Sequence, residues 1–168
     1  KGLEIIEAHY LFGVKESVID VVIHPQSIVH SLVSYLDGSV LAQLAHPDMK
    51  IPIAYTLSWP NRMNINMPQL DLSKVGSLEF YDPDKDKFPA LRLARESIKS
   101  GGSACLAFNA ANEIAVAEFL AGKIRFTDIV TLVEKVLEKN IKAGPKSIEE
   151  VIFMDNEVRK YTESIVGA

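Results

Sequence analysis

The sequence predicts an α+β fold: a small mixed β-sheet with helices in residues 1–61, followed by an all-α four-helix bundle in residues 88–168. Two observations predict it. The first part carries β-branched runs on both sides of an Asp37-Gly38 turn signal. The second part carries apolar residues at helical spacing, separated by glycine stops and by serine or threonine caps. Residues 62–87, which are rich in proline and aspartate and hold few long apolar runs, are predicted to be a linker.

The first segment is predicted to be a helix over residues 1–12, because Leu3, Ile6 and Tyr10 recur at helical spacing and Gly13 can end the helix. The β-branched run 18–23 then predicts a buried strand. His24-Pro25 interrupts this strand, because proline has no N–H to donate to a ladder.

A hairpin is predicted next. Residues 28–36 and 39–45 form its two strands on either side of the Asp37-Gly38 turn. Residues 51–59 are predicted to be a short helix that Pro60 ends. The predicted sheet therefore has three strands.

The bundle is predicted from four helical patterns. The first covers residues 88–100, with Pro89 in its first turn and Gly101-Gly102 at its end. Ser103 is expected to cap the second, which runs to Leu120, is apolar on nearly every side and should be the central helix. Thr127 is expected to cap the third. Ser147 with Glu150 predicts a capping box for the fourth, whose expected buried residues are Val151, Ile152, Val158 and Ile165.

Composition limits the class of protein. Hydrophobic residues make up 48% of the chain and charged residues 24%, so a packed core is expected. The net charge of −4 argues against nucleic acid or an anionic membrane as a partner. A single cysteine, Cys105, permits no internal disulfide and favours a reducing, cytosolic-type compartment. No apolar run reaches the ~20 residues that a membrane helix needs. The chain begins with Lys1 inside a predicted helix and without Met, so we expect it to be part of a longer protein.

Lys1 and Glu4 are the first candidate site residues. They lie three residues apart and therefore share one face of the opening helix. A lysine can hold a phosphate or a substrate hydroxyl while a neighbouring carboxylate binds a divalent cation. From spacing alone, an ordinary surface ion pair is the simpler interpretation.

His24 and His30 lie six residues apart on extended chain, which is far for two ligands of one metal. His30 alternates with Ile28 and Leu32, so a hydrogen-bonded core or interface histidine is favoured over a catalytic one. Ser27 and Ser31 offer hydroxyl contacts, but no activating base is evident beside them.

Three further sets of residues leave alternatives open. Pro47 and Met49 lie in a loop after a strand, where they can contact a flat cofactor ring or form a plain loop. Asn109, Asn112 and Glu113 share one face of the central helix, where a structural hydrogen-bond network is favoured over a binding site. Cys105 is expected to be an inert core residue. The sequence carries no dinucleotide-binding glycine fingerprint, no phosphate-binding loop and no paired-cysteine or metalloprotease motif.

Several segments together resemble the C-terminal part of 1-deoxy-D-xylulose 5-phosphate reductoisomerases. They are KGLE (1–4), HPQSIVHSLV (24–33), DGSVLAQLAHPDM (37–49), WPNR (59–62), FNAANEIAVAEFL (108–120) and IRFTDI (124–129). The resemblance covers most of the chain. It implies a partial catalytic or connecting domain in residues 1–61, a C-terminal bundle, and a homodimer formed through the sheet of the connecting domain.

The resemblance also implies an activity: NADPH- and divalent-cation-dependent conversion of 1-deoxy-D-xylulose 5-phosphate, a sugar phosphate, to 2-C-methyl-D-erythritol 4-phosphate in non-mevalonate isoprenoid synthesis. The cation would be Mg²⁺, Mn²⁺ or Co²⁺. Glu4 would bind the metal and the substrate, Lys1 would bind the substrate, and His30 would shape the site. Pro47 and Met49 would lie near the nicotinamide. The first turn should therefore form the rim of a cavity.

The family's other metal carboxylates, its phosphate-binding residues, its mobile lid and its NADPH domain lie upstream of the segments matched here. The chain alone is therefore expected to be catalytically inactive. The alternative is a structural or dimerisation module without catalysis of its own. The resemblance implies a cytoplasmic location, or a plastid if a transit peptide precedes this sequence.

Overall fold

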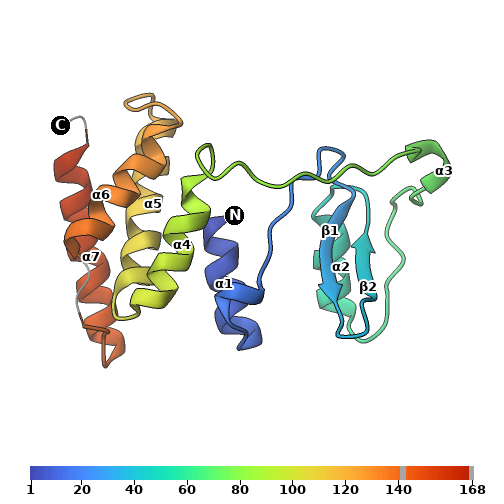
Figure 1. Cartoon of the computed structure of the whole chain (residues 1–168), viewed down its shortest axis with the longest axis horizontal. Helices are drawn as coiled ribbons and strands as arrows, with labels where there is room; N and C mark the ends of the chain where they lie inside the picture. The colour runs from blue at the N-terminus through green and yellow to red at the C-terminus, as the bar shows by residue number, and fades with distance from the viewer. Residues whose placement is uncertain (141–142, 167–168) are drawn as a thin grey trace. The chain divides into compact units, whose positions relative to one another are not determined.

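The computed structural model describes residues 1–140 and 143–166 (Figure 1). The described residues form seven α-helices and one two-stranded antiparallel sheet, which confirms the α+β class. The chain divides into two compact units. We call Lys1–Val21 together with Pro83–Ala168 the helical unit, and Val22–Asp82 the hairpin unit.

The helical unit is built around α5. Its elements in chain order are α1 (Gly2–Phe12), the 3₁₀ helix η1 (Glu16–Val18), α4 (Pro89–Ser100), α5 (Ala104–Leu120), α6 (Asp128–Asn140) and α7 (Ile148–Ile165). The helix α5 packs against α4, α6 and α7. Its inward positions are small: Ala104, Ala107, Ala110, Ala111 and Ala115 are all fully buried. Alanine on this face lets neighbouring helices approach closely, so α5 is central, as its sequence predicted.

The helix α1 joins the four predicted bundle helices, which the sequence did not predict. Ile5 and Ile6 are buried within the same core cluster as Leu93 and Phe108. A Cβ atom added at Gly2 would lie 2.8 Å from the carbonyl oxygen of Ala90 and 2.9 Å from Cζ of Phe108. Glycine at this position therefore allows α1 to pack closely against α4 and α5.

Several predicted helix ends are confirmed, whereas Ser103 occupies the N-cap position of α5 without a side-chain capping hydrogen bond. Gly13 follows α1 in the left-handed conformation with a φ of 63°. The hydroxyl of Ser147 accepts a hydrogen bond from the backbone N–H of Glu150 at 3.2 Å, as a capping box requires. The carboxylate of Glu150 accepts from the N–H of Lys146 at 2.6 Å, one residue before the predicted donor.

The prediction for the buried side of α7 is partly wrong. Val158 is buried, but Val151 and Ile152 are exposed, and Thr162 is fully buried although it was not predicted. Apolar spacing defines a face of a helix but does not show which turns of that face a neighbour covers. None of the described helices is long and apolar enough to cross a bilayer.

The hairpin unit contains β1 (Val29–Ser34), β2 (Val40–Leu44), α2 (Lys50–Ser58) and the short helix α3 (Leu72–Val75). The two strands are antiparallel, with Leu32 opposite Ala42. At the predicted turn, Gly38 adopts a φ of 85° and the carboxylate of Asp37 accepts a hydrogen bond from the N–H of Ser39 at 2.9 Å. The hairpin prediction is therefore confirmed at its turn as well as in its strands.

The predicted strand over residues 18–23 is wrong. The described backbone has η1 up to Val18 and then an isolated bridge between Ile23 and Tyr81, so the sheet has two strands instead of three. Strand preference depends on a partner strand more than on the backbone itself. Here the guanidinium of Arg95 takes the carbonyl oxygens of Glu16 and Ile19 as acceptors instead.

The structure divides the chain differently from the predicted domains 1–61, 62–87 and 88–168. Residues 1–21 group with the C-terminal helices, and residues 22–82 form the other unit. Residues 1–21 join the helical unit because the apolar face of α1 is buried in a core formed by residues that lie far from α1 in the sequence. The predicted linker also holds structure of its own, because Asp71 caps α3 by accepting from the N–H of Ser73.

Candidate functional site

The first turn of α1 brings Lys1 and Glu4 together. A carboxylate oxygen of Glu4 lies 3.1 Å from the α-amino group of Lys1, and both side chains are at least half exposed. The carboxylate stands at the N-terminal end of a helix, where unpaired N–H groups favour negative charge. The predicted sharing of one face is therefore confirmed.

The ionisation of Glu4 follows from this position. Partial burial acts to raise its pKa, but hydrogen bonds from its own backbone N–H and from the α-amino group and side chain of Lys1 outweigh burial and lower the pKa to about 2. Glu4 is therefore a carboxylate at neutral pH. This is the state in which it can bind a hard cation or a hydroxyl group.

His30 lies on β1 and is exposed within this chain. Its Nε2 lies 3.1 Å from the carbonyl oxygen of Ala45, so Nε2 carries the proton and donates. The side chain is hydrogen-bonded, as expected, but it does not lie in a core. His24 behaves as a structural residue: its Nδ1 bonds the carbonyl oxygen of Glu79 at 2.8 Å and its ring stacks on Phe80.

The loop before α2 presents both predicted cofactor-contacting residues to solvent. Pro47 is exposed, and the Met49 side chain is 70% exposed. Asp48 fixes the loop between them, because its carboxylate accepts from the N–H of Lys50 at 2.8 Å. An exposed methionine on a fixed loop can pack against a flat ring.

Two of the three polar residues predicted to share a face of α5, Asn109 and Glu113, take part in a structural network of the kind that the sequence favoured; for Asn112 it stays a prediction. The amide of Asn109 donates to Glu113 at 3.0 Å, and Glu113 also pairs with Arg159 of α7 at 2.5 Å. Arg159 bonds Asp155 as well, at 2.6 Å. These contacts join α5 to α7. Cys105 is half-buried, and burial raises the pKa of its thiol, so the thiol stays protonated and unreactive.

The predicted site residues belong to both units. Lys1 and Glu4 lie in the helical unit, whereas His30, Pro47 and Met49 lie in the hairpin unit. Two cavities of about 240 and 320 Å³ occur in the helical unit, and neither is lined by Glu4. The cavity expected at the first turn is therefore not formed by either of them.

The donor set does not fit a metal ion held by this chain alone. Among residues 1–140 and 143–166, no three acidic, histidine or cysteine side chains are grouped closely enough to hold an ion. A hard cation needs about six oxygen ligands, and Glu4 supplies one carboxylate. The hairpin unit likewise shows no glycine-rich turn before a helix of the kind that holds a dinucleotide.

Comparison with known proteins decides the family. The model of the DXP reductoisomerase C-terminal domain matches residues 44–161. The 1-deoxy-D-xylulose 5-phosphate reductoisomerase of Zymomonas mobilis is 52% identical over 159 residues, which are 95% of this chain and 41% of that protein. The chain belongs to the 1-deoxy-D-xylulose 5-phosphate reductoisomerase family.

Solved structures of reductoisomerases agree with this assignment. The Zymomonas mobilis enzyme in complex with NADPH matches with a TM-score of 0.91 at 49% identity, over 99% of this chain and 44% of that one. A DOX-P reductoisomerase in complex with NADPH, fosmidomycin and magnesium matches with a TM-score of 0.91 over 97% and 42%. The chain thus spans less than half the length of the reductoisomerases it matches.

Proposed function

We propose that this chain supplies the C-terminal part of an enzyme that converts 1-deoxy-D-xylulose 5-phosphate to 2-C-methyl-D-erythritol 4-phosphate in isoprenoid synthesis. The observation that carries the proposal is the match over 99% of the chain to a reductoisomerase structure containing NADPH. A related structure contains magnesium, which supports Mg²⁺ as the cation; Mn²⁺ and Co²⁺ remain proposals from the resemblance alone.

Within that enzyme, we assign Glu4 and Lys1 to the substrate and the cation. Glu4 contributes one carboxylate to a cation site that residues beyond this chain complete. The Lys1 side chain offers an ammonium group to a substrate oxygen. A bound divalent cation would supply Lewis-acid polarisation of the substrate carbonyl.

The residues of the hairpin unit have positioning roles in this proposal. His30 fixes the end of the hairpin by donating to the carbonyl oxygen of Ala45, which precedes the loop. That loop presents Pro47 and Met49 as an apolar surface for the nicotinamide. These side chains would orient the cofactor and exclude water from it.

The chain alone is proposed to be inactive, since it holds one of the carboxylates and none of the dinucleotide-binding fold. Purified chain, NADPH, substrate and Mg²⁺ should give no NADPH oxidation. Measurable turnover would overturn this part of the proposal.

A chimera tests the function itself. This chain replaces the matching C-terminal 41% of the Zymomonas mobilis reductoisomerase, with which it shares 52% identity. We expect Mg²⁺-dependent NADPH oxidation that requires the sugar phosphate. A folded chimera without that activity would contradict the proposal, and circular dichroism and thermal melting would show whether it is folded.

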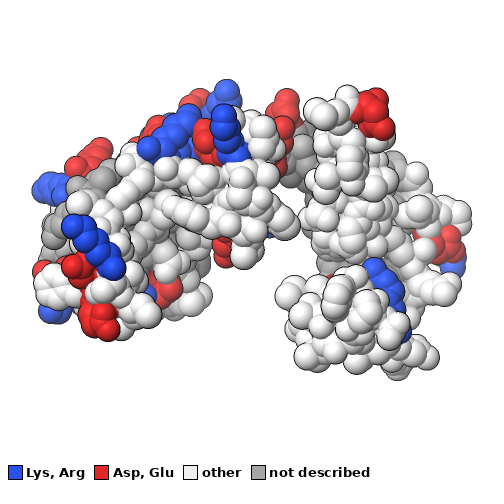
Figure 2. All heavy atoms as spheres, turned by 90° about the horizontal axis from the view of Figure 1, so that it is seen from below, with Lys and Arg blue, Asp and Glu red and all other residues white. Residues whose placement is uncertain are grey.

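A second candidate function is a dimerisation module. Among the described residues, the two-stranded sheet leaves one edge of β1 and one edge of β2 unpaired. The sheet also exposes the apolar side chains of Val33, Val40 and Leu41. Figure 2 shows few charged side chains on the face of the hairpin unit that it presents. Such an edge favours pairing with a second copy, so we propose a homodimer through the sheet.

Sedimentation velocity tests the dimer. We expect a mass twice that of the chain and a shift to monomer in Leu41→Lys, with Leu120→Lys, a similarly exposed residue of the helical unit, as the matched control. Equal behaviour of the two variants would exclude the sheet as the interface. A Mn²⁺ titration of the folded chimera then separates the two functions: weaker Mn²⁺ binding in Glu4→Gln than in the parent supports the catalytic role, and equal binding leaves only the scaffold role.

A further inference from the structure

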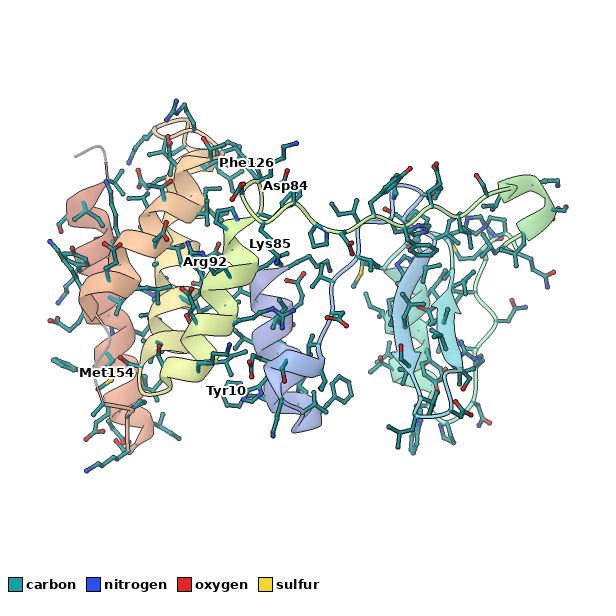
Figure 3. The ribbon with its side chains drawn as sticks, in the orientation of Figure 1. Tyr10, Asp84, Lys85, Arg92, Phe126 and Met154 are labelled. Carbon is teal, nitrogen blue, oxygen red and sulfur yellow. The ribbon has the colours of Figure 1, made fainter. Side chains whose placement is uncertain are left out.

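Two segments of the hairpin unit that lie far apart in the sequence are held together by contacts that the proposed function does not use. Ile23 and Tyr81 exchange two backbone hydrogen bonds, of 2.8 and 2.9 Å. We call residues 23–27 and 79–81, which these bonds join, the clasp. Both segments belong to the hairpin unit, whose side chains Figure 3 draws as sticks around β1, β2 and α2, so the contacts of the clasp lie within one compact unit.

Glu79 contributes to the clasp through both its side chain and its backbone. Its carboxylate accepts hydrogen bonds from the side-chain amide of Gln26 at 2.7 Å and from the hydroxyl of Tyr81 at 3.0 Å. Its N–H donates to the side-chain oxygen of Gln26 at 3.2 Å, and its carbonyl oxygen accepts from Nδ1 of His24 at 2.8 Å. A single hydrogen bond at an exposed carboxylate contributes little, so the combination of these bonds on one residue is what holds the segment.

The turn after Gln26 needs this support. Ser27 has a φ of 51°, in the left-handed region that residues with a side chain rarely adopt. Its N–H donates to the carbonyl oxygen of His24 at 3.1 Å, which closes the turn. A residue keeps such a conformation where surrounding contacts leave it no alternative. Here these contacts are the bonds of His24 and Gln26 to Glu79, so Glu79 holds the turn although it lies far from it in the sequence.

The turn leads into the contacts that hold the loop before α2. The carbonyl oxygen of Ile28 accepts from the N–H of Ala45 at 3.0 Å, and Nε2 of His30 donates to the carbonyl oxygen of Ala45 at 3.1 Å. The strand register shifts between Val29 and Ser31, so His30 is the additional residue of a bulge, a feature that re-aims a side chain. Both backbone groups of Ala45 are therefore held from the start of β1, and the loop begins at the next residue.

We propose that Glu79 is a positioning residue for the apolar surface that Pro47 and Met49 present to the nicotinamide. By holding Gln26 and the turn at Ser27, it fixes the start of β1 and, through it, the loop before α2. Without the clasp the turn relaxes, and the loop loses its fixed position. This inference rests on the role that the proposed function gives to Pro47 and Met49.

The proposal separates two kinetic quantities. Displacement of the loop weakens contact with the cofactor, whereas the cation site is assigned to Glu4 in the helical unit. Disturbing Glu79 should therefore raise the KM for NADPH and leave the Mg²⁺ requirement unchanged. A merely structural residue would lower the amount of folded enzyme, and with it the apparent kcat, without changing the KM for NADPH.

Amide exchange on the whole chain tests the positioning without any catalysis. Glu79→Ala should speed exchange of the Ala45 amide by about threefold or more, because its acceptor Ile28 is no longer held in place. The amide of Tyr35, which donates to the carbonyl oxygen of Ser39 at the turn of the hairpin, should be unchanged. Unchanged exchange at Ala45, or equal acceleration of both amides, would overturn the proposal.

Asp71→Ala is the matched control variant. Asp71 is an exposed carboxylate of the same unit, and its bonds to the N–H and hydroxyl of Ser73 are local. Its loss should leave exchange at Ala45 unchanged, and Glu79→Gln, which keeps an acceptor for Gln26, should behave like the parent. Acceleration as large in Asp71→Ala as in Glu79→Ala would reduce the effect to general destabilisation and contradict the proposal.

Kinetics in the chimera with the Zymomonas mobilis reductoisomerase test the effect on the cofactor. Glu79→Ala should raise the KM for NADPH by roughly threefold to tenfold, with kcat at saturating NADPH and the Mg²⁺ requirement within about twofold of the parent. A KM no higher than in Asp71→Ala would overturn the link to the nicotinamide. An inactive but folded chimera would contradict the proposed function, and the exchange measurement would still decide whether Glu79 positions the loop.

A double-mutant cycle tests the route through Gln26. Gln26→Ala and Glu79→Ala should each raise the KM for NADPH, and the double variant should raise it no further than the larger single change, because both remove the same contact. Effects that multiply in the double variant would mean that the two residues act independently, which would contradict this route.

Discussion

At the scale of single residues, the charge of Glu4 is set by the first turn of its own helix. Burial disfavours the carboxylate, but hydrogen bonds from its own N–H and from Lys1 lower its pKa from 4.5 to about 2. A carboxylate held ionised in this way is available to a cation throughout the physiological pH range.

This pKa predicts a pH dependence of stability. Since the folded-state pKa is depressed, ionised Glu4 stabilises the folded chain above about pH 4.5, and that contribution is lost as the pH falls through about 2. A ¹³C titration of the Glu4 carboxyl group should give a midpoint near pH 2. In Glu4→Gln, the free energy of unfolding should change less with pH between about pH 2 and pH 4.5 than in the parent. A midpoint at the ordinary value for glutamate would contradict the hydrogen bonding described for the first turn.

Gly2 gives a second prediction at this scale. A methyl group there would lie 2.8 Å from the carbonyl oxygen of Ala90, which is backbone and cannot rotate away. Gly2→Ala should therefore lower the free energy of unfolding by about 1–3 kcal/mol, as overpacking does. Urea unfolding followed by circular dichroism measures it, and Glu7→Ala on the exposed face of α1 is the control. A change in Gly2→Ala no larger than in the control would contradict close packing of α1.

Spacing alone anticipated some residue contacts and missed others. The grouping of Asn109 with Glu113 followed from their separation of four, but their partner Arg159 is 46 residues away from Glu113. The buried hydroxyl of Ser97 of α4 has no hydrogen-bond partner among the residues that the structure describes. No sequence signal predicted this, because a helical pattern does not show whether a buried serine finds an acceptor.

At the scale of elements, Arg95 determines the backbone that follows α1. Its guanidinium donates to the carbonyl oxygens of Glu16 and Ile19, and Lys99 pairs with the Glu16 carboxylate at 3.4 Å. Carbonyl groups used in this way are not available to a strand ladder. This explains why the β-branched run 18–23 does not become a strand.

Removing this side chain should loosen the segment. Arg95→Ala should lower the free energy of unfolding by about 2 kcal/mol, because two charge-assisted hydrogen bonds of a partly buried group are lost. Amide exchange of residues 16–21 should become faster. Arg125→Ala removes an exposed ion pair with Asp128 and should lower the free energy of unfolding less than Arg95→Ala does. Equal effects of the two variants would contradict the role of Arg95.

Elements with local end signals were the predictable ones. Gly13, Ser147 and the Asp37-Gly38 turn act within a few residues of the chain, so their sequences determine their structures. The prediction of buried residues in the first turns of α7 was wrong, because the burial of Val151 and Ile152 depends on neighbouring elements that spacing does not describe.

At the scale of the whole molecule, the division into units depends on contacts distant in sequence. Ile5 and Ile6 enter a core made mostly by residues after Leu93, so the opening helix belongs with the C-terminal helices. A composition shift near residue 62 could not reveal this. The fold class and the helices after residue 88 were predictable, whereas the pairing of α1 with α4 was not.

The candidate site was predictable only in part, for the same reason. The spacing of Lys1 and Glu4 predicts a shared face, whereas the role that we propose for them in catalysis rests on the resemblance to the family and not on spacing. His30, Pro47 and Met49 lie in the other unit, so no local pattern joins them to Glu4.

The central claim is that the first turn of α1 takes part in the chemistry of the assembled enzyme. It is tested most directly by comparing Glu4→Gln with Glu7→Gln, an exposed acid on the same helix, in the chimera with the Zymomonas mobilis reductoisomerase. Glu4→Gln should lower kcat by roughly a hundredfold or more and raise the Mg²⁺ concentration needed for half-maximal activity. Glu7→Gln should leave both quantities within about twofold of the parent. Equal activity of the two variants, at the same Mg²⁺ dependence, would contradict the claim.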